Sequence, residues 1–160
     1  MSKPEFVYTT YIESTPEKVW KGLTDPSFTS QYWELEFVTD WKPGSPMAWK
    51  QRAITIESPE QKVLEYDPFT RLSYVWHAFT AEWAEEFSID ADIWAVIREE
   101  PHSRVTFELE QQGDKVKLTV IHDGMEADST VLGMISGGWP KVLASLKTLL
   151  ESSATTGVYA

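Results

Sequence analysis

Residues 137–151 read GGWPKVLASLKTLLE, an amphipathic run that follows a break in the chain. From about Ser129 onward, apolar residues recur at helical spacing and form one stripe that can face a core. The stripe consists of Leu132, Ile135, Trp139, Val142, Leu146 and Leu149. Pro140 has no amide proton to donate to Ser136, so the run is predicted to be kinked or divided into two helices there. We therefore expect a C-terminal helix that lies against an apolar surface.

Length, charge and cysteine content limit the class of protein. A chain of 160 residues predicts one domain over 1–160, with a flexible tail after about residue 152. The formal net charge of -11 argues against nucleic acid and anionic membranes as partners, because affinity for phosphate comes mostly from Lys and Arg. The chain has no cysteine, which excludes disulfides and thiolate sites. No apolar run approaches the ~20 residues of a membrane span, so we expect a cytoplasmic protein.

Short strands separated by turns occupy most of the sequence before this helix. Residues 5–12 alternate in the manner of a strand, Thr15-Pro16 begins a helix, and Asp25-Pro26 begins a second short one. Further strands are expected as hairpins, over 33–41 with 47–56, 62–66 with 71–77, and 104–111 with 115–121. Hairpins in series predict an antiparallel sheet with one apolar face, and the C-terminal helix is the expected cover of that face.

The segment 78–103 breaks this pattern. It is acidic and aromatic, and only residues 92–99 indicate a short helix. Its carboxylates form either a solvated face or a docking patch for a basic partner, and the solvated face is favoured. They are Glu82, Glu85, Glu86, Asp90 and Asp92. We interpret the segment as a mobile cover over part of the molecule.

Several motifs together resemble a known family. They are 15–20 (TPEKVW), 23–26 (LTDP), the strand 104–109 (RVTFEL), 122–124 (HDG) and 138–140 (GWP). The combination resembles the group related to the C-terminal domain of the activators of heat-shock-protein-ninety ATPase, within the START and birch-pollen-allergen-like (SRPBCC) superfamily. The resemblance implies an α+β helix-grip fold, in which a curved antiparallel sheet wraps around a long C-terminal helix and two short helices follow strand 1. It also implies a cavity between sheet and helix.

The resemblance leaves the function open, since fold does not determine function. Members of the superfamily bind apolar small molecules, act on polyketide-like substrates, or assist a chaperone. The favoured hypothesis is a non-catalytic module that binds a hydrophobic, aromatic or lipid-like molecule in the cavity, without a cofactor. A polyketide-cyclase-like or hydrolase-type enzyme that uses the same cavity is the alternative, and a co-chaperone-like interaction domain is the second. A homodimer and a protein partner are also left open.

Eight tryptophans in this length indicate a bulky core or an aromatic-lined pocket. Strand parity and family position give the candidate ligand-binding residues Trp49, Trp76, Phe79, Trp83, Trp94, Phe107, His122, Met134 and Trp139. Most of these are also candidates for the core.

His122 is the candidate with chemistry. The alternation of the strand before it points its side chain inward, where a neutral imidazole can donate to a ligand or act as a general base. The competing interpretation, a histidine at a strand end that is satisfied by a hydrogen bond to a backbone carbonyl, is favoured. The chain's three histidines lack the paired spacing of a metal site, so no metal is predicted. No serine lies in a nucleophile elbow, which argues against a serine hydrolase.

Overall fold

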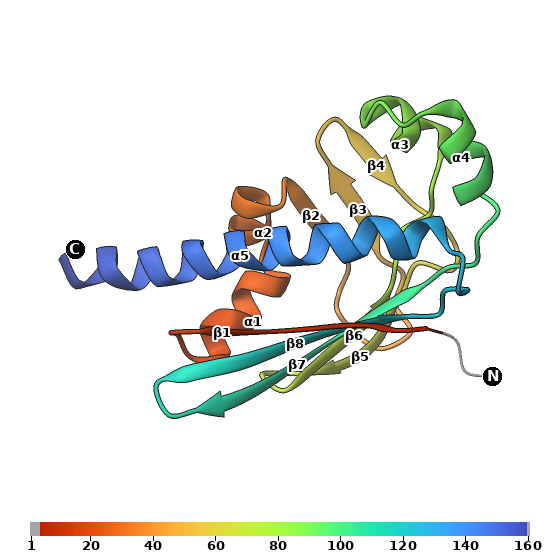
Figure 1. Ribbon diagram of the computed structural model, residues 1–160. Coiled ribbons are helices and arrows are strands. Elements are labelled where there is room, and N and C mark those ends of the chain that lie inside the picture. The colour runs from red at the N-terminus through yellow and green to blue at the C-terminus, as the bar shows by residue number, and fades with distance from the viewer. Residues whose placement is uncertain (1–3, 160) are drawn as a thin grey trace.

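A computed structural model describes residues 4–159 of the chain, and the side chains of residues 4–152. Its main layer is a five-stranded antiparallel sheet in the order β1-β8-β7-β6-β5. The strands are β1 (Phe6–Ile12), β5 (Val63–Asp67), β6 (Arg71–Val75), β7 (Arg104–Gln112) and β8 (Lys115–Asp123). The long helix α5 (Thr130–Tyr159) lies over one face of this sheet (Figure 1). The helix-grip α+β fold expected from the sequence is confirmed.

The two short helices after β1 are also where the sequence places them. Helix α1 (Pro16–Thr24) begins at Thr15, whose hydroxyl accepts a hydrogen bond from the amide of Lys18. Helix α2 (Pro26–Tyr32) begins at Asp25, which accepts from the amide of Ser27. In each helix a proline occupies the first turn, where its missing amide proton costs nothing.

A second, three-stranded sheet differs from the expectation of one long hairpin over 33–41 and 47–56. Strand β2 (Leu35–Val38) pairs with β3 (Ala48–Gln51), which pairs in turn with β4 (Ile54–Ile56). The expected strand 47–56 is therefore two strands, joined by a tight turn in which Arg52 has a φ of 53°. The first expected strand is shorter because Glu34 and Trp41, with φ of 52° and 62°, bend the chain on either side of β2.

The segment 78–103 contains two helices where the sequence predicts one. Helix α4 (Ala91–Ile97) corresponds to the expected helix over 92–99, and α3 (Ala81–Glu86) was not expected. The hydroxyl of Thr80 accepts a hydrogen bond from the amide of Trp83 and so begins α3. In Figure 1 both helices lie beyond β4, above the N-terminal end of α5.

Helix α5 is continuous through Pro140, so the alternative of two separate helices is wrong. Its buried stripe is Val131, Ile135, Trp139, Leu143, Leu146 and Leu150. Three residues of the expected stripe, Leu132, Val142 and Leu149, lie half-buried at its edge. Because the stripe packs on the sheet and on α1, a methyl group of Leu146 lies where a Cβ on Gly22 would clash, at 2.6 Å.

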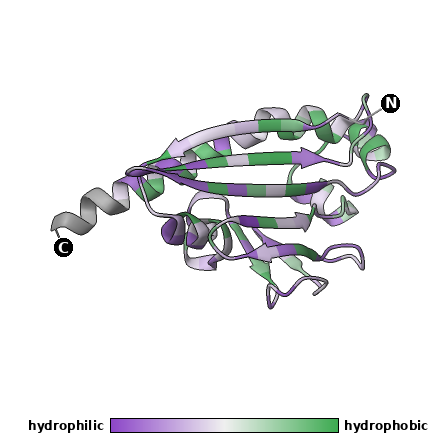
Figure 2. Cartoon of the chain, turned by 90° about the horizontal axis from the view of Figure 1, so that it is seen from below, coloured by the Kyte–Doolittle hydropathy of each residue, from purple (hydrophilic) through white to green (hydrophobic). Residues whose placement is uncertain are grey.

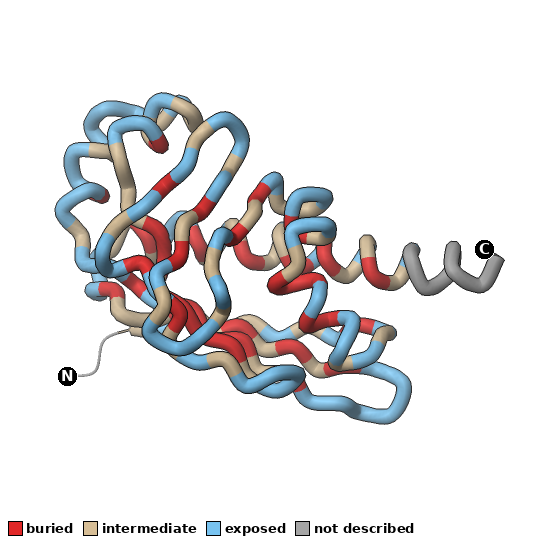
Figure 3. Tube along the Cα trace, turned by 180° about the vertical axis from the view of Figure 1, so that it is seen from behind, coloured by how far each residue is buried: buried red, intermediate tan, exposed pale blue. Residues whose placement is uncertain are grey.

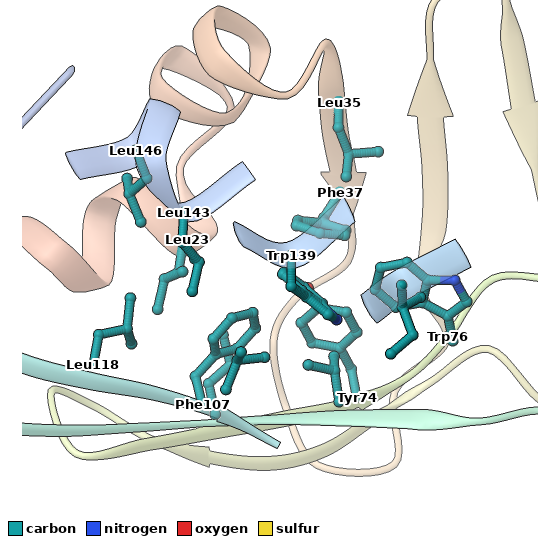
Figure 4. Packing of buried hydrophobic residues seen from close by; sticks show 14 of the residues in the cluster. Leu23, Leu35, Phe37, Tyr74, Trp76, Phe107, Leu118, Trp139, Leu143 and Leu146 are labelled. Carbon is teal, nitrogen blue, oxygen red and sulfur yellow. The ribbon is translucent and has the colours of Figure 1, made fainter. Parts of the chain in front are cut away.

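The core fills the space between α5 and the five-stranded sheet. Figure 4 shows side chains of α5, such as Trp139 and Leu143, meeting Tyr74, Phe107 and Leu118 from the sheet. Buried positions follow the strands and the facing side of α5 (Figure 3), and hydropathy alternates along the strands (Figure 2). Strand β8 shows this directly, since Val116, Leu118, Val120 and His122 are all buried and the residues between them are not.

The sequence predicts a flexible tail after about residue 152. The side chains of that part of the chain lie outside the described ones, so the tail stays a prediction. Within residues 4–159, none of the helices has the length and apolar character needed to cross a membrane.

Candidate functional site

A cavity of about 330 Å³ lies at the N-terminal half of α5, between that helix, the α3 segment and the loop after β6. Its lining consists of Trp33, Gln51, Trp76, His77, Phe79, Trp83, Phe87, Ile89, Val131, Met134, Ile135, Gly138, Trp139 and Val142. None of these side chains is an acid, a lysine or an arginine, and most are aromatic or aliphatic. The volume is within the range of small-molecule sites, and the apolar lining with few polar groups is typical of them.

Helical spacing explains the contribution of α5. Val131, Ile135 and Trp139 belong to the buried stripe, and Met134 and Gly138 lie one position before the last two. Met134 is 40% exposed, so it lies where the cavity meets solvent. Gly138 has no side chain to fill the space beside it, and a Cβ added there would meet no atom within 4 Å. The helix therefore supplies an apolar wall with a gap at Gly138.

Aromatic rings from other elements complete the wall, and two of them pack against Trp139 of α5. The ring of Trp76 lies 5.4 Å from that of Trp139, and Trp33 lies 5.5 Å from Trp139. Phe79 contacts Trp83 at 4.9 Å between ring centroids. These edge-to-face and tilted contacts hold the rings in fixed positions, so the wall is built before any ligand arrives.

His122 is held in the core by two hydrogen bonds. The indole of Trp139 donates to its Nδ1 at 3.0 Å, and its Nε2 lies 2.7 Å from the hydroxyl of Ser103. Since an indole can only donate, Nδ1 carries no proton and Nε2–H must donate to Ser103. Burial lowers the pKa of His122 to about 3, which keeps the ring neutral. His122 does not line the cavity, and both of its nitrogens have hydrogen-bond partners. The partners are the side chains of Ser103 and Trp139, and not the backbone carbonyl expected from the sequence.

His77 lies at the cavity instead. Its Nδ1 is 2.7 Å from the carbonyl oxygen of Ala78, and the residue is only 6% exposed. Burial lowers the pKa of His77 to about 4, so this imidazole is also neutral near pH 7.

Five of the nine residues predicted from sequence line the cavity, namely Trp76, Phe79, Trp83, Met134 and Trp139. The other four lie elsewhere. Trp49 and Phe107 are in the core behind the aromatic wall, with rings 4.8 Å from Trp76 and 5.5 Å from Trp139 respectively. Trp94 donates to the carbonyl of Phe79 at 3.3 Å and carries Arg98 over its ring, so it supports the wall from outside.

Sequence reasoning missed several lining residues, above all His77. The alternation of β6 assigned Trp76 to the inside and so His77 to the outside, but the strand ends at Val75 and parity no longer applies. Trp33 begins the strand expected over 33–41, and the structure places it between α2 and β2, outside any strand. Phe87 and Ile89 directly follow α3, a helix that the sequence does not predict.

The acidic residues of the 78–103 segment lie away from the cavity. Glu82, Glu85, Asp90 and Asp92 are exposed and Glu86 is half-buried, as expected for a solvated face. Glu100 has a different role, because its carboxylate accepts a hydrogen bond at 3.0 Å from the amide of Thr130 and so caps α5. Among the described residues, no three His, Cys, Asp or Glu side chains gather closely enough to hold a metal ion.

The two buried imidazoles predict a loss of stability in mild acid. In the unfolded chain a histidine has a pKa of about 6.5, whereas the native values of His77 and His122 are about 4 and about 3. The unfolded state therefore binds more protons as the pH falls below 6.5, and native stability is lost from there toward pH 4. We expect each imidazole to lower the free energy of unfolding by about 1–2 kcal/mol between pH 7 and pH 5.

Urea unfolding measures this loss at the two pH values, both of which lie above the ordinary pKa values of Asp and Glu. A His77→Asn variant should lose less than the wild type over the same interval. Equal stability of the wild-type protein at pH 7 and pH 5 would contradict the neutral burial of these rings.

Comparison with known proteins shows which family and which solved structures this chain is similar to. The sequence model of the family described as "Activator of Hsp90 ATPase homolog 1-like protein" matches residues 13–151. Among curated proteins, no significant sequence relative was found.

Solved structures share the fold at low identity. A protein from Mesorhizobium loti has a TM-score of 0.72 and 22% identity, with 93% of this chain and 98% of that chain covered. The Aha1 dimer from Colwellia psychrerythraea has a TM-score of 0.66 and 18% identity, with coverage of 92% and 96%. DynU16, a protein of the dynemicin biosynthetic locus, has a TM-score of 0.69 and 14% identity, with coverage of 95% and 49%.

Proposed function

We propose that this chain, which belongs to the family of activator of Hsp90 ATPase homolog 1-like proteins, binds an uncharged and largely apolar small molecule in the cavity beside α5. The observation that carries the proposal is the cavity of about 330 Å³ whose lining includes no acid, lysine or arginine. A charged ligand would lose its hydration there without gaining an ionic partner, which costs several kcal/mol. An apolar ligand gains about 25 cal/mol for each Å² of surface removed from water.

The construction of the walls supports the proposal further. Water is held poorly in a cavity that offers few polar partners, so little must be displaced when a ligand enters. The ring contacts of Trp76 and Trp139 fix the wall, which reduces the entropy lost on ligand binding. Exposed Met134 gives the mouth a flexible apolar side chain that can adapt to different ligand shapes.

The enzyme alternative loses its main support. From the sequence, that alternative depends on His122 as a general base, but His122 accepts a hydrogen bond from Trp139 and donates one to Ser103. The lining itself includes no Asp or Glu. The biosynthetic locus is a property of DynU16, and it gives this chain no catalytic role. The cavity favours binding over acid-base catalysis. The homodimer and the protein partner that the sequence leaves open stay hypotheses.

Titration with N-phenyl-1-naphthylamine, a neutral dye that fluoresces in apolar surroundings, tests the proposal. We expect saturable binding of one dye molecule per folded chain, together with quenching of tryptophan fluorescence, because Trp76 and Trp139 line the cavity. The same titration in urea above the unfolding transition should show no saturable binding. A linear, unsaturated response from the folded protein would contradict the proposal.

A further inference from the structure

His77 is a polar side chain in an otherwise apolar part of the cavity lining. It follows β6 directly and lies between aromatic rings, 4.8 Å from Trp49 and 4.8 Å from Phe79 between centroids. Only 6% of the residue is exposed, yet it is one of the residues that line the cavity. A buried polar group normally has a hydrogen-bond partner, so the partner of each ring nitrogen must be identified.

The Nδ1 atom has its partner within the chain. It lies 2.7 Å from the carbonyl oxygen of Ala78, and a carbonyl oxygen can only accept. Nδ1 must therefore carry the proton and donate it. In a neutral imidazole this leaves Nε2 with a lone pair and no proton, so that Nε2 is an acceptor.

The Nε2 atom has no hydrogen bond to any described residue. Among the described residues, the fully buried side-chain atoms without a hydrogen-bond partner belong to Ser14, Thr29, Trp49 and Tyr74. Nε2 of His77 has no partner but is not one of these atoms, so it is not fully buried. Nε2 therefore keeps some exposed surface, and because His77 lines the cavity, we infer that this surface faces the cavity. The structure thus presents one fixed acceptor on a wall made mainly of rings.

We propose that Nε2 of His77 accepts a hydrogen bond from the ligand, so that the site selects neutral aromatic or alicyclic molecules that carry a hydroxyl or N–H group. The inference rests on the proposed function, because it assigns the ligand class of the same cavity. An aromatic alcohol satisfies the acceptor and leaves its ring against Trp76 and Trp139. A purely hydrocarbon ligand fills the same volume but leaves Nε2 desolvated without a partner, which is unfavourable.

Apart from His77 and the indole N–H groups, the polar side chain in the lining is Gln51, at the end of β3. Its amide offers both a donor and an acceptor on a flexible side chain, so it imposes no single requirement on the ligand. His77 differs because its ring is fixed by the bond to Ala78 and by its aromatic neighbours. Gln51 is therefore the natural control for the assignment.

Displacement of N-phenyl-1-naphthylamine by 2-naphthol and by 2-methylnaphthalene, which have similar shapes, tests the inference. The comparison uses wild type, His77→Asn and Gln51→Leu. The asparagine amide can still donate to the carbonyl of Ala78 but has no atom at the place of Nε2. We expect His77→Asn to weaken binding of 2-naphthol by about 2- to 12-fold, the range of one net hydrogen bond, and to change that of 2-methylnaphthalene less than about twofold.

Each outcome has a distinct meaning. If both compounds displace the dye and His77→Asn weakens neither selectively, or if only Gln51→Leu does so, the assignment to His77 is overturned while the binding function stands. If wild type binds neither the dye nor the naphthalenes, the proposed function itself fails and the inference with it.

A second measurement avoids the variants, in case His77→Asn does not fold. The ¹⁵N resonance of Nε2 in the wild-type protein reports a hydrogen bond to that atom directly. We expect it to move on addition of 2-naphthol and to stay in place on addition of 2-methylnaphthalene. An unmoved resonance in protein saturated with 2-naphthol would overturn the inference.

Discussion

Trp139→Ala is expected to lower the free energy of unfolding by about 3–5 kcal/mol, the range for truncating a buried tryptophan. Trp139 is 2% exposed and lies at the centre of the contact between α5 and the sheet, with its ring 5.5 Å from that of Phe107. Its indole also supplies the hydrogen bond to Nδ1 of His122, so truncation leaves a buried acceptor without a partner.

Urea unfolding of three variants measures this loss of stability and separates the contribution of packing from that of the hydrogen bond to His122. Trp139→Phe keeps a ring in the core but removes the indole N–H, and we expect it to cost about 1–3 kcal/mol through the unpaired His122. Ser145→Ala, at an exposed position of the same helix, should stay within about 0.5 kcal/mol of wild type. Equal midpoints for Trp139→Ala and Ser145→Ala, with matched slopes, would contradict the packing of α5 described above.

The elements that could be predicted from sequence have strong local signals. Helix α1 follows from Thr15-Pro16 and α2 from Asp25-Pro26, because cap and first-turn proline act within a few residues. Strands β7 and β8 alternate cleanly and meet at Gly113, whose φ of 66° suits glycine. Each of these elements is determined by residues that are close together in the chain, so the sequence alone predicts it.

The errors have equally physical causes. The turn between β3 and β4 uses Arg52-Ala53, which has none of the Gly, Asn or Asp that usually signal a left-handed conformation. Helix α3 spans only Ala81–Glu86, too short for a periodic pattern to emerge. The stripe expected on α5 includes Val142, whereas the buried residue is Leu143. Both residues are apolar, and only packing against the sheet decides which of the two is buried.

At the site, strand parity predicts the direction of a side chain within a regular strand, but it does not predict which residues that side chain contacts. His122 does point inward, as predicted, yet Trp139 from a distant helix occupies its Nδ1. His77 reaches the cavity because β6 ends before it and the chain turns. Such outcomes depend on elements that are far apart in sequence, and no local pattern encodes them.

Placing a side chain in the cavity is expected to weaken binding of the dye without loss of the fold. Gly138 lines the cavity, has open space at its Cβ position, and lies four residues after Met134 on α5. A leucine at this position points back along the helix over the preceding turn, and so into the cavity. Replacement of glycine by leucine also favours the helix by about 0.8 kcal/mol, so the variant should fold.

Gly137 provides the matched control. It is the neighbouring glycine of the same helix, it also has open space around its Cβ position, and it is exposed to solvent outside the cavity lining. Gly137→Leu therefore makes the same chemical change with the same gain in helix propensity, but leaves the cavity empty.

The most direct test of the account is the dissociation constant of N-phenyl-1-naphthylamine for Gly138→Leu, measured beside Gly137→Leu and wild type. We expect Gly138→Leu to weaken binding by at least about tenfold, equivalent to about 1.4 kcal/mol, while Gly137→Leu stays within about twofold of wild type. Equal affinities for all three proteins, with the dye bound and the folds intact, would contradict the cavity beside α5 as the binding site.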